Sequence, residues 1–511
     1  MQNLSIHLLA LASFSILPLQ AEPLSPKQVE TAAENLLANA RKELKDTGIP
    51  GMALAVIFED KVLLAEGLGV REVGTDRAVD TNTVFQMASV SKPIGSTVVA
   101  ALVGQGVIGW DARIADLDPS FAMPDPWVTK EIQIRDMYSH RSGLPSHAGD
   151  LLEDMGYSRE EILHRLRFQP PEGSFRAHYA YTNFGLTAAA GAAAKAAGKD
   201  WATLSEDLLY KPLGMTSTSS RFSDFEKHPN HALGHELVEG KWGHRTQRQP
   251  DAQSPAGGVS SSVNDLIKWM QLQLNGGKFE GKVLIEATAL EETHRPQVLT
   301  GSRKDTGLPT FYGLGWDTRH DEAGRLRLSH SGAFSLGAAT YVALLPEQKL
   351  GIVILSNGAP IGVPEGLGNT FLDEAITGSA SQDWMKVFKS IFAKMAEEER
   401  SQLPKNPPKN ATPPASPDTY QGTYASEFFG PVEVTTTDSG LTLALGPKPH
   451  LHPLTPWNRD TFTYEPVGEN ANGPSAVTFS LGPNGKADRM TIENLDAHGL
   501  GTFLRIPPST P

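Results

Sequence analysis

The chain has 511 residues, of which 39% are hydrophobic and 20% charged, close to ordinary globular usage and unlike a disordered chain or a protein with many membrane spans. Its formal net charge is -13 and it has no run of Lys or Arg, which excludes nucleic acid as a main partner because phosphate binding needs clustered cations. The absence of cysteine excludes disulfides, a thiolate nucleophile and a cysteine metal site.

The N-terminal segment predicts export. Residues 4–19 are apolar, and Leu19-Gln20-Ala21 resembles a cleavage site. We expect a signal peptide over 1–21 and a periplasmic or secreted protein, although an n-region without Lys or Arg leaves an uncleaved anchor open. No later segment is long and apolar enough to span a bilayer.

A helix and a hairpin are predicted next. Ser25 can cap a helix in which Pro26 takes the first position and which ends near Gly48. Residues 52–58 and 62–66 are typical of two strands joined by a polar turn.

The middle of the chain is rich in helix, as in 186–197, and strand patterns return at 338–345 and 350–356. Strands at both ends with helices between them predict an α/β (α+β) fold whose sheet is assembled from remote segments. Residues 381–400 indicate an amphipathic helix, and the proline-rich 403–417 a linker.

The C-terminal region has a different pattern. From Tyr420 onward, short alternating runs such as 432–434 and 461–464 are separated by turn signals such as Pro483-Asn484-Gly485. This pattern predicts a small antiparallel all-β module.

Ser89-Val90-Ser91-Lys92 is the first group of residues that can carry chemistry. On a helix, residues three apart share a face, so the Ser89 hydroxyl and the Lys92 amine can meet. Pro93 fits only an early helical position, which places Ser89 at the helix start. By itself, the spacing also fits a helix cap and a solvated lysine.

Two further segments add to this one. In Tyr181-Thr182-Asn183, the outer side chains can point the same way from an extended segment, although Asn183 could equally cap a helix. In His330-Ser331-Gly332, the glycine permits close approach of a substrate, and the backbone N–H of Ala333 can stabilise an oxyanion.

In this order, the three segments resemble Ser-x-x-Lys, Tyr-x-Asn and His-x-Gly of the serine β-lactamase and penicillin-binding-protein superfamily, including class C β-lactamases. Flanking segments are similar too: Phe85–Ala88, Ile134–Leu144, Pro255–Val259 and Asp265-Leu266. The resemblance covers about 27–378 and implies an antiparallel sheet flanked by helices, with an all-helical subdomain. No cofactor and no metal are expected.

The resemblance also implies residue roles. Ser89 is the nucleophile that forms an acyl-enzyme, and Lys92 and Tyr181 share its proton in one network. Asn183 binds the substrate amide, and the N–H groups of Ser89 and Ala333 form the oxyanion hole. His330 stands with Gly332 where many β-lactamases carry a lysine that binds the substrate carboxylate. This departure favours peptidase or esterase activity on D-amino-acid peptides or esters over efficient β-lactam hydrolysis.

Two alternatives stay open. His231 and His235 have the spacing of a metal pair on a helix, but Pro229 and Gly234 and the missing His-Glu-x-x-His pattern oppose a zinc hydrolase. The second alternative is a penicillin-binding sensor or scaffold with weak catalysis.

We therefore expect a signal peptide (1–21), a β-lactamase-like hydrolase domain (22–400), a linker (401–417) and an all-β domain (418–511). The last domain resembles the barrel-like lipocalin-like module of some relatives, with a packing or capping role. Expected partners are a small-molecule or short-peptide substrate, and homo-oligomers are possible.

Overall fold

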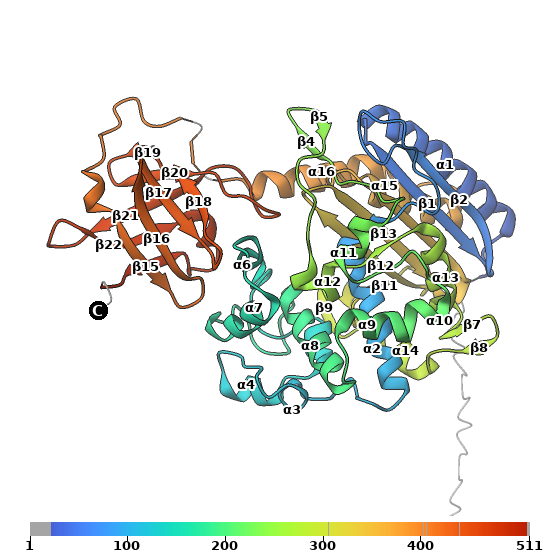
Figure 1. Ribbon diagram of the computed structural model, residues 1–511. Helices are drawn as coiled ribbons and strands as arrows, with labels where there is room; N and C mark the ends of the chain where they lie inside the picture. Colours follow the sequence, from blue (N-terminus) through green and yellow to red (C-terminus); the bar gives the residue numbers. More distant parts are fainter. Residues whose placement is uncertain (1–21, 305, 402, 405, 439, 508–511) are drawn as a thin grey trace, which may run out of the picture.

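The computed structural model describes residues 22–507 except 305, 402, 405 and 439. The expected signal peptide lies outside the described residues. Figure 1 shows a large body built on one sheet and, to its left, a smaller all-β module. Within the described ranges, no helix is long and apolar enough to cross a membrane.

The body contains an eight-stranded sheet in the order β2-β1-β14-β13-β12-β11-β10-β9, with antiparallel pairing throughout. As predicted, segments remote in the sequence supply neighbouring strands, since β1 pairs with β14. The strands are β1 (Gly51–Phe58), β2 (Lys61–Gly69), β9 (Val298–Ser302), β10 (Pro309–Tyr312), β11 (Asp317–His320), β12 (Leu326–Phe334), β13 (Ala338–Leu345) and β14 (Leu350–Ser356).

The continuous apolar run of β1 has a simple cause. Every residue of β1 is buried, because the strand lies between β2 and β14 and the helices α1 and α13 pack against it. The predicted hairpin to β2 is confirmed, and Glu59 and Asp60 make its turn with positive φ angles of 47° and 64°. The left-handed conformation at both positions matches the twist of the strands.

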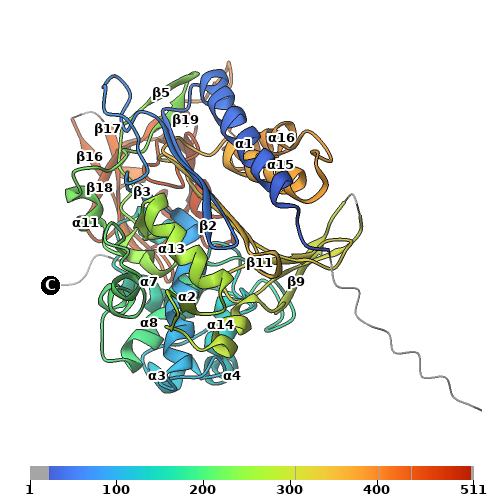
Figure 2. The same ribbon diagram turned by 90° about the vertical axis from the view of Figure 1, so that its right-hand side faces the viewer.

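One face of the sheet packs against α1 (Pro26–Thr47) and α15 (Val363–Thr377), and α16 (Trp384–Glu398) lies against α15. Figure 2 shows these three helices together on one side of the sheet. Pro26 and Gly48 stand at the two ends of α1 as predicted. The predicted cap was wrong in one respect: the Ser25 side chain makes no capping hydrogen bond.

The opposite face carries the larger, helix-rich core, which separates the sheet from the helical part of the body. Its α-helices are α2 (Ser91–Gly104), α3 (Ile114–Leu117), α4 (Pro126–Glu131), α5 (Ile134–Tyr138), α6 (Asp150–Asp154), α7 (Arg159–Arg165), α8 (Asn183–Ala196), α9 (Trp201–Ser205), α10 (Lys211–Leu213), α11 (Phe222–Lys227), α12 (Ser254–Gly257), α13 (Val263–Leu274) and α14 (Ala287–His294). Short pairs complete the body: β3 (Phe85–Gln86) with β6 (Ser260–Ser261), β4 (Glu236–Val238) with β5 (Lys241–Gly243), and β7 (Lys278–Phe279) with β8 (Lys282–Val283).

The module is a nine-stranded antiparallel sheet that curls into a nearly closed barrel, as the alternating pattern predicted. Its strands are β15 (Gly422–Ser426), β16 (Gly430–Thr437), β17 (Gly440–Leu445), β18 (His450–Pro453), β19 (Thr455–Asn458), β20 (Thr461–Tyr464), β21 (Ser475–Leu481), β22 (Ala487–Ile492) and β23 (Thr502–Arg505). Alternate side chains fill its interior, for example Val432 and Val434 of β16.

Candidate active site

Ser89 lies in a short 3₁₀ turn, Ala88–Val90, that joins β3 to α2. Ala88 has a φ of 46°, a conformation that costs energy for a residue with a Cβ and that surrounding contacts must hold. The Met87 N–H donates to Val259 O at 2.8 Å, and the Thr340 hydroxyl donates to Met87 O at 2.7 Å. The turn is therefore fixed from two sides, and Ser89 stands half-buried at the helix start.

Lys92 is fully buried beneath Ser89. Its Nζ lies 3.0 Å from Ser89 Oγ, 2.7 Å from Asn183 Oδ1 and 3.1 Å from Ala256 O. Burial lowers the pKa of Lys92 to about 7, although the charge of Asp150 opposes that shift. A neutral amine has two N–H groups and a lone pair. Asn183 and Ala256 can take the two N–H groups, which leaves the lone pair for the Ser89 proton.

Tyr181 reaches Ser89 from the other side. Its hydroxyl donates to Ser89 Oγ at 2.8 Å, and Lys92 Nζ lies 4.5 Å from the centre of its ring. Burial raises the pKa of Tyr181 well above its usual value, while the bond to Ser89 acts in the opposite direction. Tyr181 is therefore a neutral proton donor at pH 7.

Asn183 is the first residue of α8 and does not cap it, since Thr182 occupies the capping position. Its Nδ2 donates to Asp150 Oδ2 at 2.8 Å, and the same oxygen lies 2.9 Å from His147 Nδ1. Ser89, Lys92, Tyr181, Asn183 and Asp150 thus form one bonded group, the nucleophile cluster. Sequence reasoning missed Asp150 and His147, which carry no recognisable spacing to the other members.

His330 is buried and contributes no positive charge. Its Nδ1 lies 2.7 Å from Ser331 O and must donate, so Nε2 accepts from the Tyr312 hydroxyl at 2.8 Å. Burial and the nearby Lys92 lower the pKa of His330 to about 3. Tyr312 also packs against the buried His140 ring, at 4.7 Å between ring centres. Sequence reasoning did not single out these two aromatic neighbours.

Gly332 lets β12 approach the nucleophile turn. A Cβ at this position would lie 2.4 Å from Met87 O and 3.0 Å from the backbone N of Ser89, so any other residue would push the strand away. β11 pairs with β12 only as far as Ser329, whereas β13 pairs with β12 to Phe334. Among the described strands, none covers the second edge of 330–334, so Ala333 and its neighbours border open space.

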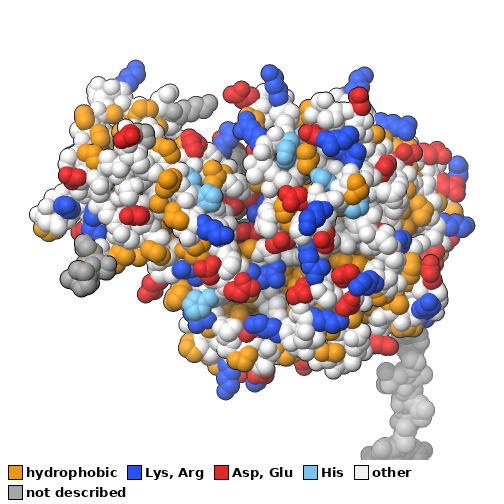
Figure 3. Space-filling model, in the orientation of Figure 1, with side chains coloured by type: hydrophobic (Ala, Val, Ile, Leu, Met, Phe, Trp, Pro, Cys, Tyr) orange, Lys and Arg blue, Asp and Glu red, His pale blue; other side chains and the backbone are white. Residues whose placement is uncertain are grey.

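A cleft of about 1380 Å³ lies in front of Ser89. Of the predicted site residues, it is lined by Ser89, Tyr181, Asn183 and Ala333, together with Ser331, whereas His330, Gly332 and Lys92 stand behind its surface. Its outer wall comes from β4, α16 and the C-terminal module. Figure 3 shows the surface hollowed between the module and the body.

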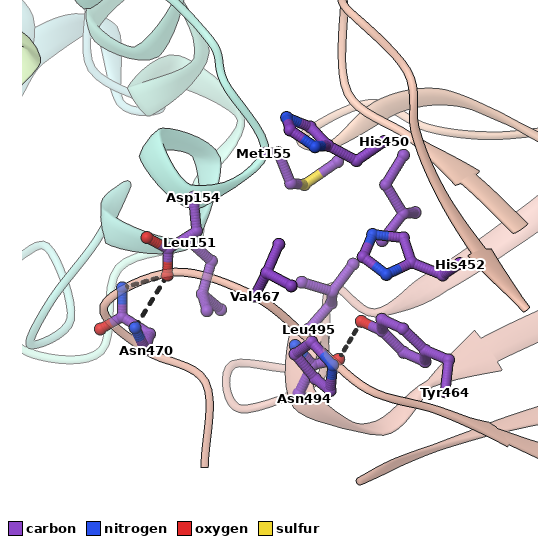
Figure 4. Close-up of a pocket in the computed structure, with 12 residues that line it drawn as sticks. Leu151, Asp154, Met155, His450, His452, Tyr464, Val467, Asn470, Asn494 and Leu495 are labelled. Carbon is purple, nitrogen blue, oxygen red and sulfur yellow. Dashed lines mark hydrogen bonds between the residues drawn. The ribbon is translucent and has the colours of Figure 1, made fainter. Parts of the chain in front are cut away.

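A second group of charged residues fastens the module beside this cleft. Arg248 forms an ion pair with Glu153 of α6, and Glu469 of the module accepts from the Ser335 N–H at 2.5 Å. Asp154 accepts from the N–H groups of Glu469 and Asn470 at 3.0 and 2.9 Å, and Figure 4 shows Asp154 facing Asn470. We call Arg248, Glu153, Asp154 and Glu469 the seam cluster.

The cavity in Figure 4 lies at this seam and has a volume of only about 30 Å³. It is lined by Leu151 and Met155 from the body and by His452 and Tyr464 from the module. This space is too small for an organic substrate, so the large cleft is the candidate site.

The histidine pair has no metal-binding geometry. The segment from His231 to His235 is not helical, and each ring has other partners: His231 Nδ1 bonds to His228 O, and His235 Nε2 accepts from the Val73 N–H. Over residues 22–507 with their gaps, no group of three or more His, Cys, Asp or Glu could hold a metal ion.

Comparison with known proteins assigns two segments. Residues 36–376 match the family model described as beta-lactamase. Residues 406–502 match a domain of unknown function, DUF3471.

Curated relatives extend this match. An unguisins hydrolase of Aspergillus violaceofuscus is 24% identical over 76% of this chain and 74% of its own length. The D-alanyl-D-alanine-carboxypeptidase/endopeptidase AmpH of Escherichia coli is 23% identical over 62% of this chain and 81% of its own length. Among solved structures, the octameric penicillin-binding protein homologue from Pyrococcus abyssi aligns with a TM-score of 0.61 at 18% identity, covering 92% of this chain and 99% of that one.

Proposed function

This chain belongs to the β-lactamase family, a family of serine hydrolases that includes the penicillin-binding proteins, and we propose that it is an exported hydrolase that cleaves amide or ester bonds through an acyl-enzyme on Ser89. The observation that supports this proposal most directly is the contact of Ser89 Oγ with both Lys92 Nζ and Tyr181 OH, at 3.0 and 2.8 Å. A nucleophile held beside a base with a pKa near 7 is the arrangement that covalent catalysis needs.

The first step is attack of Ser89 Oγ on the substrate carbonyl while its proton passes to neutral Lys92. The raised pKa of Tyr181 makes it a poor base and favours Lys92 as the acceptor. The N–H groups of Ser89 and Ala333 would stabilise the oxyanion. Tyr181, placed over Lys92, would relay the proton to the leaving group. Water then hydrolyses the acyl-enzyme with the same two residues and restores Ser89.

The substrate class follows from the walls of the cleft. Asn183 offers an amide in front of α8, and the open edge of β12 offers backbone N–H and C=O groups to an extended substrate. The neutral His330 cannot pair with a carboxylate as a lysine would. These features support D-amino-acid peptides or esters as substrates, in keeping with the name of the carboxypeptidase/endopeptidase relative. Because a neutral His330 would hold the carboxylate of a penicillin and that of a D-alanyl-D-alanine peptide equally weakly, esters and amidated peptides are favoured most.

The division of the chain belongs to the same proposal. Residues 22–400 would be the hydrolase domain, 401–417 the connection and 418–511 a lipocalin-like module that closes one wall of the cleft. The contacts of Glu469, Phe429 and His498 with the body support this role: the Tyr157 hydroxyl donates to Phe429 O at 2.7 Å, and His498 Nε2 lies 3.1 Å from Ser146 O.

The test is turnover of three substrates, a p-nitrophenyl ester, an N-acetyl-D-alanyl-D-alanine dipeptide and a penicillin, by wild type and Ser89→Ala. We expect cleavage of the ester and the dipeptide, slow turnover of the penicillin, and no activity in a folded Ser89→Ala. Turnover that survives in Ser89→Ala contradicts the proposal. A lasting penicillin adduct without turnover of any substrate would instead favour a sensor.

A further inference from the structure

Ser331 and Glu365 form a polar pair in the wall of the cleft that the mechanism does not use. Along β12, Gly332 faces the nucleophile turn, and Ser331 points to the other face, where its register partner Tyr341 packs with α15. The Ser331 hydroxyl donates to Glu365 Oε1, in the first turn of α15. Both residues line the same cleft as Ser89.

Glu365 lacks a counter-charge. Glu365 is 3% exposed, and its Oε2 has no hydrogen-bond partner within the described part of the chain. No Lys, Arg or His of the described residues forms an ion pair with it. Burial raises the pKa of Glu365 to about 7. A buried carboxyl with an unused acceptor oxygen needs a donor, preferably a positive one.

The rest of the cleft does not favour an anion either. Arg248, Arg400 and His147 line it, but each has a carboxylate partner, Glu153, Glu397 and Asp150 respectively. Other carboxylates in the lining include Glu236 and Glu398. A ligand carboxylate would therefore meet like charges, whereas an ammonium group would meet opposite ones.

We propose that Ser331 and Glu365 form a subsite for an ammonium group, or an amide N–H, on the leaving-group side of the substrate. The side follows from the proposed function, on which this inference rests. If Asn183 on α8 binds the acyl amide, the β12 wall across Ser89 is left for the leaving group. The hydrolase then prefers amine-bearing or amidated acyl donors to those that end in a free carboxylate.

The test uses three dipeptides that differ in one group: N-acetyl-D-alanyl-D-alanine, its C-terminal amide, and the analogue in which an aminomethyl group replaces the carboxylate. Each is measured at pH 8 as a competitive inhibitor of p-nitrophenyl ester turnover, so the readout does not require its cleavage. Wild type should bind the aminomethyl analogue at least tenfold more tightly than the carboxylate, with the amide between them.

Glu365→Gln should remove this ranking, and Glu236→Gln, which changes another carboxylate of the cleft, should preserve it. The wild-type ranking tests the subsite even where Glu365→Gln does not fold. Equal or tighter binding of the carboxylate by wild type overturns the inference, and so does an unchanged ranking in Glu365→Gln. In both of these cases, Ser89-dependent ester turnover would still support the proposed function. If wild type does not turn over the ester at all, the proposed function itself has failed.

Discussion

The nucleophile cluster and the seam cluster both bury a basic side chain among polar groups, yet they stabilise opposite states of it. The direct partners of Lys92 are neutral, and its one nearby carboxylate, Asp150, is linked to it through Asn183. Burial therefore outweighs the charge of Asp150, and the pKa of Lys92 falls to about 7. Burial also opposes the charge of Arg248, but Glu153, Glu469 and Asp154 raise its pKa. The balance of carboxylates thus separates an amine that can be neutral near pH 7 from a guanidinium that stays charged.

The strongest test of this comparison is to replace Lys92, the proposed base. Lys92→Ala should lower kcat/KM for ester hydrolysis by about 10²–10⁴-fold, the usual contribution of a general base. Lys92→Arg should not rescue activity, because a guanidinium stays protonated and cannot accept the Ser89 proton. Lys195→Ala, on the exposed side of α8, is the matched control. Activity near the wild-type level in Lys92→Ala would contradict the assigned role.

The pH profile sharpens the comparison. Because the proposed mechanism needs a neutral Lys92 and the pKa of Lys92 is about 7, kcat/KM should rise with pH, half-maximal near pH 7. Asp150 raises the pKa of Lys92, so Asp150→Asn should move this limb to lower pH and reduce the plateau roughly tenfold by disturbing Asn183. Asp154→Asn, one turn further along α6, should leave the limb in place. A limb that both variants shift equally would disprove the link.

Substitutions in the seam cluster should change the free energy of unfolding more than the rate of hydrolysis. Glu469→Ala removes the acceptor of the Ser335 N–H and one counter-charge of Arg248, which should cost about 1–3 kcal/mol of unfolding free energy. Small-ester turnover should change by less than about threefold, because no seam residue touches Ser89. Urea unfolding measures the loss, with the exposed Glu465→Ala as the control. A large fall in kcat without a change in stability would instead assign Glu469 to the reaction.

The smallest effect is expected from the histidines. His231→Ala should alter kcat/KM by less than about threefold, and a chelator should have no effect, because His231 bonds to His228 O and not to a metal-binding group. Loss of activity on chelation, restored by added zinc, would favour the metal-dependent alternative.

Local pattern was enough to predict much of the fold, and it singled out some residues of the candidate site. The apolar run of β1 and the Pro26 and Gly48 boundaries of α1 are properties of short segments, and so is the Ser89 to Lys92 spacing. Asp150 and Glu365 could not be found in this way. Each reaches the cleft from a separate element, and only tertiary packing decides which partner it meets.

Docking of the module likewise has no signature in the sequence, since Glu469 contacts Ser335 across 134 residues of chain. The Ser25 cap failed for a related reason. A side chain suited to a helix start does not have to use that capacity once the Pro26 ring and the tertiary contacts of Gln28 define the first turn of α1.

The most direct test of the acyl-enzyme is peptide mapping by mass spectrometry after exposure to a fluorophosphonate. The account predicts one adduct, on Ser89, in wild type and none in a folded Ser89→Ala, with labelling that slows as pH falls below 7. An adduct on another serine, or a folded wild type that resists labelling at every pH, would contradict it.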